Sequence, residues 1–454
     1  MKLGDIIEVE IESTGMEGEG VAKCDGFVVF IEGALLHEII RAQVKEIKKN
    51  FARARVIKVL QASDMRQDPL CPIFFRCGGC DMQHIKYETQ LAIKKANVKN
   101  CIDRACKIDS VVDDVVYGKE QFGYRNKEQI PIRKVDGKAY AGFYKEGSHV
   151  FVPFEKSIDD KLGDCPLHDG KMQEVIDIVV EFINKEKLST YDEKSNTGLI
   201  RHLVIRKLSN GYSICLVING DSIPKVDKLI NKLQEEHIIF DLYLSINKKQ
   251  TNVILGDALT CVYGKDKVVG KMCGVTFKVN PNSFLQINYE VASRIYEQDL
   301  QEIGVSKDTV VLDLYSGIGI LSNIMAKNAK KVIGIEIVPE AVQDANELAI
   351  KNGNTNIENI CGDVAKALPE VISKLKGEKT VAVIDPPRKG CDQRVLDAIK
   401  QSKPFKVIYI SCNPATLARD LANLISDYEI KSIKPYDMFP QTKHVETVAV
   451  LEHK

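Results

Sequence analysis

The stretch Val407-Ile408-Tyr409-Ile410-Ser411-Cys412-Asn413-Pro414 decides the fold class of this chain. Its apolar, β-branched first half predicts a buried strand of a parallel sheet. The strand ends at Cys412, and the Asn-Pro pair that follows is typical of the start of a helix. Ligands bind at the carboxyl ends of the strands in an open α/β sheet, so Cys412 lies where a nucleophile belongs. Considered alone, the stretch also fits an inert, buried cysteine.

The strand-then-helix pattern continues through residues 281–454 and predicts a Rossmann-like, doubly wound domain. Its first strand, 309–314, runs into Tyr315-Ser316-Gly317-Ile318-Gly319, whose glycines permit a tight turn close to a ligand. The following strands end in acids, namely Glu336, Asp363 and Asp385. Simple solvation of the strand ends is the alternative explanation for such acids.

The strand-end acids suit a cofactor that contains adenosine. Glu336 lies about twenty residues beyond the turn, where a ribose-binding carboxylate is expected. Asp363 is placed to meet an adenine amine. Only two of the three glycines of a dinucleotide fingerprint are present. An adenosine cofactor without a pyrophosphate therefore fits better, and we expect S-adenosylmethionine.

Two further segments supply candidate catalytic groups. In Asp385-Pro386-Pro387-Arg388 the proline pair fixes the backbone and presents Asp385 at the sheet edge, near the expected methyl donor. Cys412 ends the neighbouring strand. Near the carboxyl end of the chain, Glu446 is a candidate acid or base, and His444 competes with it for that role.

Composition sets broad limits on the protein. Its 454 residues predict roughly two to four domains. Lysine plus arginine and aspartate plus glutamate both total 63, so any basic surface must be local. No apolar run approaches the about 20 residues that span a bilayer, and the amino terminus lacks an apolar signal core. We therefore expect a cytoplasmic protein, in which 13 cysteines indicate metal binding or catalysis before disulfides.

Residues 1–60 predict a small β-barrel of the OB type. They contain about five short strands separated by glycine turns. The last third of this segment is locally basic, and alternation places Arg53 and Arg55 on one side of a strand. A barrel with one basic face is a plausible RNA-binding platform. A merely solvated strand face is the alternative.

Three closely spaced cysteines follow the barrel, at Cys71, Cys77 and Cys80. The Gly-Gly pair between the last two lets the backbone wrap closely around a bound group. Cys165 repeats the Cys-Pro signature of Cys71 and is the expected fourth ligand. Four thiolates suit either zinc or an iron–sulfur cluster, and the spacing leaves both open.

Residues 61–280 predict a central α+β domain that carries this cysteine site. Hairpins are expected around Asp136-Gly137 and Ser209-Asn210-Gly211. A helix over about 87–106 is a candidate to pack on the catalytic domain. The domain mixes basic side chains with tyrosines, which suits single-stranded RNA. The basic residues are Arg125, Lys127, Arg133, Arg201 and Arg206.

Taken together, these motifs resemble the RNA uracil-5 methyltransferase family, in its 23S ribosomal RNA branch with a TRAM barrel and a [4Fe–4S] cluster. The resemblance spans essentially the whole chain. It rests on the four cysteines, on Asp385-Pro386-Pro387-Arg388, on Ser411-Cys412-Asn413-Pro414 and on His444-Val445-Glu446.

The resemblance implies an RNA (uracil-C5) methyltransferase, class EC 2.1.1, that acts on 23S ribosomal RNA. It implies Cys412 as the nucleophile and Glu446 as the general base. The implied contacts to S-adenosylmethionine are Gln286, Tyr315, Glu336, Asp363 and Asp385. The implied [4Fe–4S] ligands are Cys71, Cys77, Cys80 and Cys165. The resemblance thus favours the cluster over zinc.

Some positions depart from the family pattern. Ile320 stands where members often have a cofactor-binding asparagine, so that contact is missing. Ser316 replaces a frequent cysteine, Gln441 a frequent histidine, and His37 a glycine of the barrel. None of these departures falls on the nucleophile or the base.

The implied mechanism starts with the Cys412 thiolate, so a lowered pKa of this thiol is expected. The same chemistry on transfer RNA is an alternative. A nucleic-acid amino-group methyltransferase is a second one, because its acid-Pro-Pro loop resembles Asp385-Pro386-Pro387. An iron–sulfur RNA-binding module with an inactive enzyme domain is a third. We expect RNA as the partner, no membrane, no obligate protein partner and a monomer.

Overall fold

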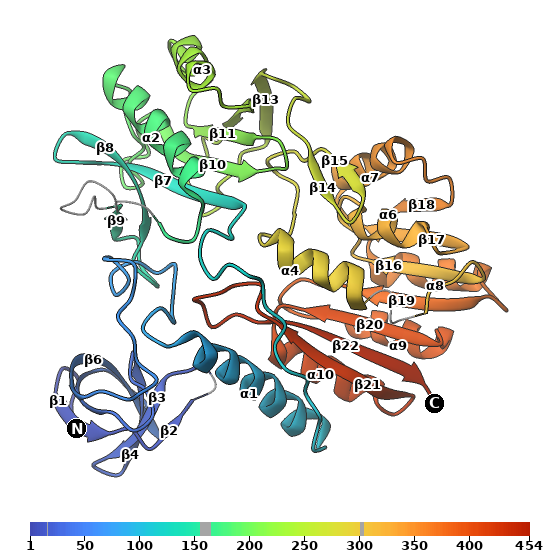
Figure 1. The fold of residues 1–454 in the computed structure, drawn as a ribbon, viewed down its shortest axis with the longest axis horizontal. Helices are drawn as coiled ribbons and strands as arrows, with labels where there is room; N and C mark the ends of the chain where they lie inside the picture. Colours follow the sequence, from blue (N-terminus) through green and yellow to red (C-terminus); the bar gives the residue numbers. More distant parts are fainter. Residues whose placement is uncertain (16, 155–164, 300–303) are drawn as a thin grey trace.

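The computed structural model describes residues 1–15, 17–154, 165–299 and 304–454. Figure 1 shows three parts: an amino-terminal barrel, a central domain beside it and a carboxyl-terminal domain that packs against the helix α1. Among the described residues, no helix has both the length and the apolar character needed to cross a membrane.

The amino-terminal part is a strongly curled six-stranded sheet. Its strands are β1 (Ile6–Glu10), β2 (Ser13–Thr14), β3 (Gly20–Cys24), β4 (Phe27–Glu32), β5 (Ile39–Ile47) and β6 (Phe51–Gln61). They are ordered β1-β5-β6-β4-β3-β2. Along β6, buried Ala52 and Ala54 alternate with Arg53 and Arg55, which face outward as the sequence predicts.

The helix α1 (Tyr87–Cys106) connects the cysteine segment to the carboxyl-terminal domain, where it packs on α10 (Pro414–Leu424). Val98 and Ile102 of α1 share one hydrophobic core with Leu417 and Leu421 of α10. The amphipathic pattern of α1 therefore serves a domain more than 300 residues further along the chain.

The central domain is a seven-stranded sheet of order β13-β12-β11-β10-β7-β8-β9. The hairpins expected at Asp136-Gly137 and near Asn210 are confirmed as β7–β8 and β10–β11. Two helices cover one face of the sheet and share its core. The elements are β7 (Lys127–Val135), β8 (Lys138–Tyr144), β9 (Phe151–Pro153), α2 (Gly170–Lys185), β10 (Ile200–Lys207), β11 (Tyr212–Ile218), α3 (Val226–Glu235), β12 (Phe240–Ile246) and β13 (Ala258–Tyr263).

The carboxyl-terminal domain is the predicted doubly wound sheet, of order β18-β17-β16-β19-β20-β22-β21. Its first five strands in this order run parallel, and β22 is inserted antiparallel next to β20. The strands are β16 (Thr309–Leu314), β17 (Lys331–Glu336), β18 (Ile357–Cys361), β19 (Lys379–Ile384), β20 (Lys406–Ser411), β21 (Tyr428–Tyr436) and β22 (Glu446–His453).

Helices cover both faces of this sheet. One core contains residues of α8 (Val364–Lys374), α9 (Gln393–Ser402), α10 and α1. The opposite core contains residues of α4 (Tyr289–Arg294), η1 (Ile295–Asp299), α6 (Ile320–Ala326) and α7 (Pro339–Lys351). The hairpin of β14 (Gly270–Met272) and β15 (Val275–Phe277) packs on the same side. The carboxyl ends of the parallel strands lie together at one edge of this sheet.

Candidate active site and cysteine cavity

The predicted cofactor residues come together at the carboxyl edge of the sheet. The strand β16 pairs with β17 on one side and with β19 on the other. The last residues of these two pairings are Leu314 of β16, Ile335 of β17 and Ile384 of β19. Tyr315 directly follows the first of these and Asp385 the third, while Glu336 pairs with Cys361 one step further on. Parallel register therefore brings side chains from distant stretches of sequence to one edge.

The turn after β16 adopts the left-handed backbone that its glycines allow. The φ angles of Tyr315, Gly317 and Gly319 are 70°, 53° and 77°. A Cβ added at Gly319 would lie 3.0 Å from the Cβ of Ala345, so the turn also packs tightly on α7. The backbone here is shaped for close approach of a ligand.

Glu336 braces this turn. Its two carboxylate oxygens accept hydrogen bonds from the backbone N–H groups of Gly317, at 3.0 Å, and Val338, at 2.9 Å. Asp363 caps α8 by accepting a hydrogen bond from the backbone N–H of Ala365 at 2.8 Å. Both acids therefore have structural partners and, with further lone pairs on their oxygens, can still accept hydrogen bonds from a cofactor.

Asp385 lies partly buried after β19, near the buried acid Asp313. Burial and the neighbouring Asp313 carboxylate raise the pKa of Asp385 to about 7. Burial also raises the pKa of Asp313 to about 6, although the Ser322 hydroxyl donates a hydrogen bond to it. This edge of the sheet therefore carries two neighbouring carboxyl groups that readily hold protons.

The register of β20 and β22 brings Cys412 next to Glu446. Ser411 pairs with Thr447 in this antiparallel ladder, so the residues one step beyond, Cys412 and Glu446, lie side by side at the strand end. The Cys412 side chain is half-buried and Glu446 is buried. The pairing of β20 with β22 thus brings together two residues that lie 34 positions apart in the sequence.

Both groups favour their neutral forms in this structure. Burial raises the pKa of Glu446 well above its usual value; Asp385 raises it further and Arg388 opposes the shift. Burial, and then the nearby Glu446, raise the pKa of the Cys412 thiol, while Arg388 lowers it. The expected lowered pKa of the thiol is therefore wrong for the protein without RNA, because desolvation outweighs the single cation.

Arg388 is a site residue for which the sequence analysis assigned no role. The loop that carries it is held against α10, where Asn413 Nδ2 and Thr416 Oγ1 donate hydrogen bonds to the Arg388 carbonyl at 3.2 and 3.3 Å. The Asp420 carboxylate accepts a hydrogen bond from the Cys391 backbone N–H at 2.8 Å. The position of Arg388 directly after Asp385-Pro386-Pro387 is the signal that could have identified it.

Two more side chains complete the surroundings. Gln286 is buried before α4, and its carbonyl accepts a hydrogen bond from Asn126 Nδ2 of the central domain at 2.8 Å. Tyr296, which the sequence analysis missed, lies near Asp385, Asp313 and Glu446, and burial raises its pKa. His444 is a weaker base than expected, because burial and then Arg388 lower its pKa to about 4.

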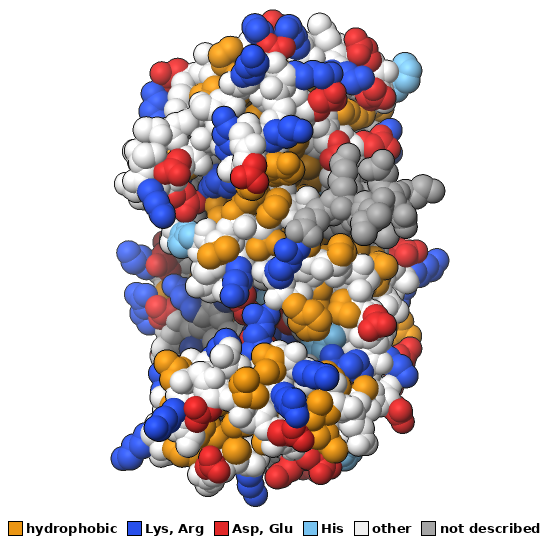
Figure 2. Space-filling view, turned by 90° about the vertical axis from the view of Figure 1, so that its left-hand side faces the viewer, with side chains coloured by type: hydrophobic (Ala, Val, Ile, Leu, Met, Phe, Trp, Pro, Cys, Tyr) orange, Lys and Arg blue, Asp and Glu red, His pale blue; other side chains and the backbone are white. Residues whose placement is uncertain are grey.

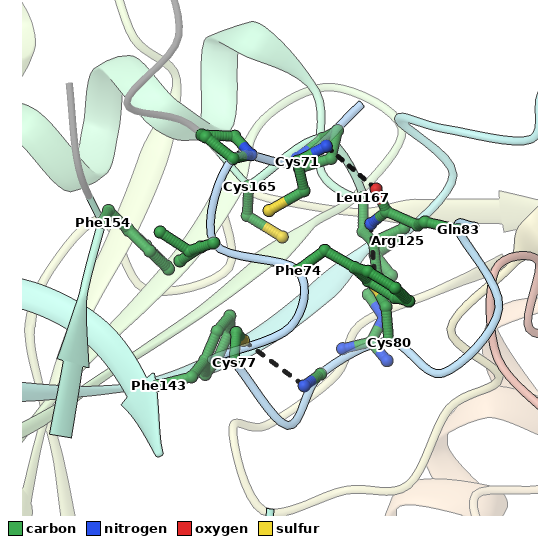
Figure 3. Close-up of a pocket in the computed structure, with 14 residues that line it drawn as sticks. Cys71, Phe74, Cys77, Cys80, Gln83, Arg125, Phe143, Phe154, Cys165 and Leu167 are labelled. Atoms are coloured by element: carbon green, nitrogen blue, oxygen red, sulfur yellow. Dashed lines mark hydrogen bonds between the residues drawn. The ribbon is translucent and has the colours of Figure 1, made fainter. Parts of the chain in front are cut away.

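The four predicted cysteine ligands converge on a second site. Cys71, Cys77, Cys80 and Cys165 line one cavity together with Phe74, Phe143 and Phe154. Figure 3 shows these side chains around a common interior. Two sulfur atoms accept hydrogen bonds, Cys77 from the Gly79 backbone N–H at 3.3 Å and Cys80 from Gln83 Nε2 at 3.2 Å.

The spacing of the four thiols is wide. Among the described residues, one group of three possible metal ligands lies within 4.8 Å of one another, and it combines Cys165 with Glu128 and His168. No three of the four cysteine sulfurs are that close. A tetrahedral zinc ion with bonds of about 2.3 Å holds its sulfurs only about 3.8 Å apart. The cavity therefore suits a group larger than a single ion.

A recess of mixed charge lies outside the cysteine cavity, between the barrel and the central domain. Figure 2 shows lysine and arginine side chains around it. The recess measures about 510 Å³. Its basic and aromatic lining residues are Phe30, Lys45, Arg53, Arg55, Phe74, Phe75, Arg76, His84, Lys145 and Lys443. Its acidic lining residues are Glu17, Glu19, Glu32, Glu46, Asp81 and Glu146. Arg55 also ties the barrel to the cysteine segment by donating a hydrogen bond to the Phe75 carbonyl at 2.7 Å.

Comparison with known proteins gives this arrangement a family. A family model described as tRNA (Uracil-5-)-methyltransferase matches residues 225–454. The chain belongs to this RNA uracil-5 methyltransferase family. A TRAM domain model matches residues 1–57, which confirms the predicted type of the amino-terminal barrel. The protein is accordingly an RNA methyltransferase of class EC 2.1.1.

Full-length relatives support the same assignment. An uncharacterized RNA methyltransferase of Halalkalibacterium halodurans is 38% identical over 99% of this chain and 97% of its own length. One of Caldanaerobacter subterraneus is 38% identical over 100% of this chain and 99% of its own. The Pyrococcus abyssi tRNA (uracil-54, C5)-methyltransferase, solved with S-adenosyl-L-homocysteine, is 25% identical and superposes with a TM-score of 0.78. That alignment covers 98% of this chain and 99% of the other.

Proposed function

We propose that this uracil-5 methyltransferase transfers a methyl group from S-adenosylmethionine to carbon 5 of a uridine, through a covalent bond between Cys412 and the base. The observation that carries the proposal is the pairing of β20 with β22, which sets a half-buried thiol beside a buried carboxyl group. Carbon 5 of uracil is a weak nucleophile, and covalent catalysis by a cysteine overcomes this weakness.

The cofactor fits the carboxyl edge of the sheet. The left-handed turn at Tyr315 and the carboxylates of Glu336 and Asp363 would hold its methionine and adenosine parts, with Gln286 and Asp385 nearer the methyl group. When bound, S-adenosylmethionine supplies an electrophilic methyl group. One cofactor contact of the family pattern is missing here. Ile320 stands where members often have an asparagine, and its side chain carries no polar group.

The chain's own residues carry the proton and electron balance. The Cys412 thiolate adds to carbon 6 of the uracil, and the electron pair displaced onto carbon 5 forms the new bond to the methyl group. The bond between that methyl group and the donor's sulfur breaks at the same time, and its electron pair stays on the sulfur. Glu446 then takes the proton from carbon 5. The electrons of that C–H bond form the double bond between carbons 5 and 6 as the C–S bond breaks and returns the thiolate.

The buried position of Glu446 suits this role. A carboxylate whose pKa is raised by burial is a stronger base than one in water, provided that it is ionised when it acts. Arg388 is the nearby cation that favours the ionised forms of both Glu446 and Cys412. The target uridine must leave its stack to reach these groups.

Covalent trapping tests the proposal. RNA that contains 5-fluorouridine cannot lose its carbon 5 substituent as a proton, so the protein should remain bound to it on a denaturing gel. We expect this band with the parent protein and S-adenosylmethionine, and its loss with Cys412→Ala. Full methylation of ordinary RNA by Cys412→Ala would overturn the proposal and support amino-group methylation instead.

For the substrate we propose 23S ribosomal RNA. The TRAM barrel and the four-cysteine cavity support this choice, because the ribosomal branch that the sequence resembles combines both features. The Pyrococcus abyssi relative is named for transfer RNA, which makes that RNA the second candidate. Covalent trapping on both RNAs, followed by mapping of the trapped uridine, distinguishes the two substrates. Trapping on transfer RNA alone would contradict the ribosomal proposal.

For the cysteine cavity we propose a [4Fe–4S] cluster held by Cys71, Cys77, Cys80 and Cys165. The wide spacing of the thiols, the apolar walls and the N–H groups directed at sulfur support it. Iron and acid-labile sulfide in about equal amounts, about four of each per chain, are expected in protein purified without oxygen. Stoichiometric zinc without sulfide would overturn the assignment. Since the reaction consumes no electrons, we assign the cluster a structural role.

A further inference from the structure

Glu446 is preceded by a largely buried turn, residues 437–445, that forms hydrogen bonds with the barrel, the central domain and α1. Tyr124 of the central domain donates to the Pro440 carbonyl at 3.0 Å, and Lys443 reaches Glu17 of the barrel at 2.9 Å. Lys94 of α1 donates to the Phe439 carbonyl at 3.0 Å. The position of Glu446 therefore depends on contacts made far from the sheet that carries it.

Gln441 lies at the centre of this turn. It is fully buried, and its φ angle of 68° is one that residues other than glycine rarely adopt. Its carbonyl accepts hydrogen bonds from the backbone N–H groups of Asp81, at 3.1 Å, and Met82, at 3.0 Å. A strained backbone of this kind persists only where its surroundings hold it.

One side chain of α1 joins the two segments. Gln90 accepts a hydrogen bond from the Gln441 backbone N–H at 3.2 Å and donates one to Gln441 Oε1 at 3.0 Å. The same carboxamide donates to the carbonyls of Met82, at 3.1 Å, and Ile85, at 2.9 Å. Gln90 is fully buried, so water cannot replace these partners.

We propose that Gln90 and the backbone of Asp81-Met82 form a clamp on Gln441 that positions Glu446 for removal of the carbon 5 proton. This inference rests on the function proposed above. Asp81 directly follows Cys80, so the cysteine loop and the clamp are one continuous segment. A bound cluster would hold the clamp in place and would thereby affect the position of Glu446. This effect involves no transfer of electrons. Gln90 is a positioning residue, since it acts through Gln441.

The clamp should act on one step of the reaction. Cys412 and the cofactor edge belong to β20 and the neighbouring parallel strands, whereas Glu446 alone follows the clamped turn. Loosening the turn should therefore spare addition and methyl transfer but slow proton removal. A displacement of about 1 Å in a proton-transfer geometry lowers the rate by roughly a hundredfold.

Gln90→Leu tests this separation. With 5-fluorouridine RNA the variant should form the covalent adduct as fully as the parent, because that adduct needs no proton removal. With ordinary RNA its turnover should fall roughly tenfold to a hundredfold. A methylated adduct should then accumulate on ordinary uridine, where the parent protein leaves none.

Asn247→Leu is the matched control. Asn247 is a buried carboxamide that braces a loop of the central domain by donating to the carbonyls of Val253, at 2.7 Å, and Ile254, at 3.0 Å. It should show no accumulation of adduct, even where it lowers the melting temperature as much as Gln90→Leu. Equal loss of trapping and turnover in Gln90→Leu would overturn the clamp. Absence of the 5-fluorouridine adduct in the parent protein would instead contradict the proposed function.

Hydrogen exchange tests the link to the cluster without using activity. The amides of Asp81, Met82, Gln441 and Lys443 all donate within the clamp. After removal of the cluster from the purified protein, peptides that contain these amides should exchange faster, whereas β20 and β22 peptides should not. Unchanged exchange of the 437–445 peptides would overturn the proposed coupling.

Discussion

Arg388 sets the balance between the thiol and thiolate forms of Cys412. It is the cation that opposes burial and Glu446 at this thiol, and the hydrogen bonds from Asn413 and Thr416 hold its loop in place. RNA phosphates are not needed for this effect. The chemistry of the nucleophile therefore depends on a residue outside the strand that carries it.

Replacing Arg388 should make Cys412 less reactive at neutral pH. In Arg388→Met the pKa of the Cys412 thiol rises further, because the one opposing charge is lost. The pH at which Cys412 is half alkylated by iodoacetamide, followed by mass spectrometry of its peptide, should move upward. Lys389→Met, at the exposed neighbouring position, is the control and should leave this pH unchanged.

The buried carboxyl group of Asp385 should lower the stability of the protein as pH rises. Its folded pKa of about 7 lies above the ordinary aspartate value of 3.8, so the folded state binds the proton more tightly. The stability this binding provides is complete below about pH 4 and is lost as pH rises through 7. The shift corresponds to about 4 kcal/mol at most.

Asp385→Asn should therefore melt at a higher temperature than the parent at pH 8. The difference should fade towards pH 4, where the parent carboxyl group is also neutral. Thermal melting across this pH range is the measurement. A gap in melting temperature that is independent of pH would show that Asp385 does not titrate as described. The gain in stability should come with a loss of methylation, which is common when buried active-site charges are removed.

At the scale of elements, a buried ion pair joins α1 to the turn 437–445 that precedes Glu446. Lys94 Nζ lies 2.5 Å from Asp437 Oδ1, and the Tyr87 hydroxyl donates to the other carboxylate oxygen at 2.7 Å. Both charged side chains are completely buried. A pair of this kind adds little net stability but is costly to break from one side.

Lys94→Met should destabilise the protein by about 3–5 kcal/mol, because it leaves the Asp437 charge buried without its cation. The double variant Lys94→Met, Asp437→Leu should recover most of this loss. Chemical unfolding of the parent, both single variants and the double variant gives the coupling between the two residues. Additive single losses would show that the two charges do not depend on each other.

At the scale of the whole molecule, RNA should span the recess between barrel and central domain. The protein has no net charge, and this recess is lined by six lysines and arginines, which come from both parts, together with six acids. Arg53 and Lys145 face it from opposite sides. Each phosphate contact that is lost should weaken binding equally for all RNA sequences.

Arg53→Ala and Lys145→Ala should each reduce the slope of log affinity against log salt by about one. The measurement is RNA binding over a series of salt concentrations. Lys248→Ala removes an exposed charge that does not line the recess and should leave the slope unchanged. An unchanged slope in all three variants would place the RNA elsewhere.

The sequence by itself determined the parts that depend on local pattern. Buried β-branched runs that end in Glu336, Asp385 and Cys412 predicted the strands, and a parallel sheet gathers such ends at one edge. The alternation of Arg53 with buried alanines predicted the basic barrel face in the same way. These features needed no knowledge of distant contacts.

Only the tertiary structure decided the contacts between distant segments. The insertion of β22 antiparallel to β20 brings Glu446 to Cys412, and the docking of α1 on α10 carries Gln90 and Lys94 to a turn about 350 residues away. The raised pKa values follow from burial, which no sequence pattern measures. Such contacts form because the folded chain excludes water around them, and local propensity contains no information about which segments will meet there.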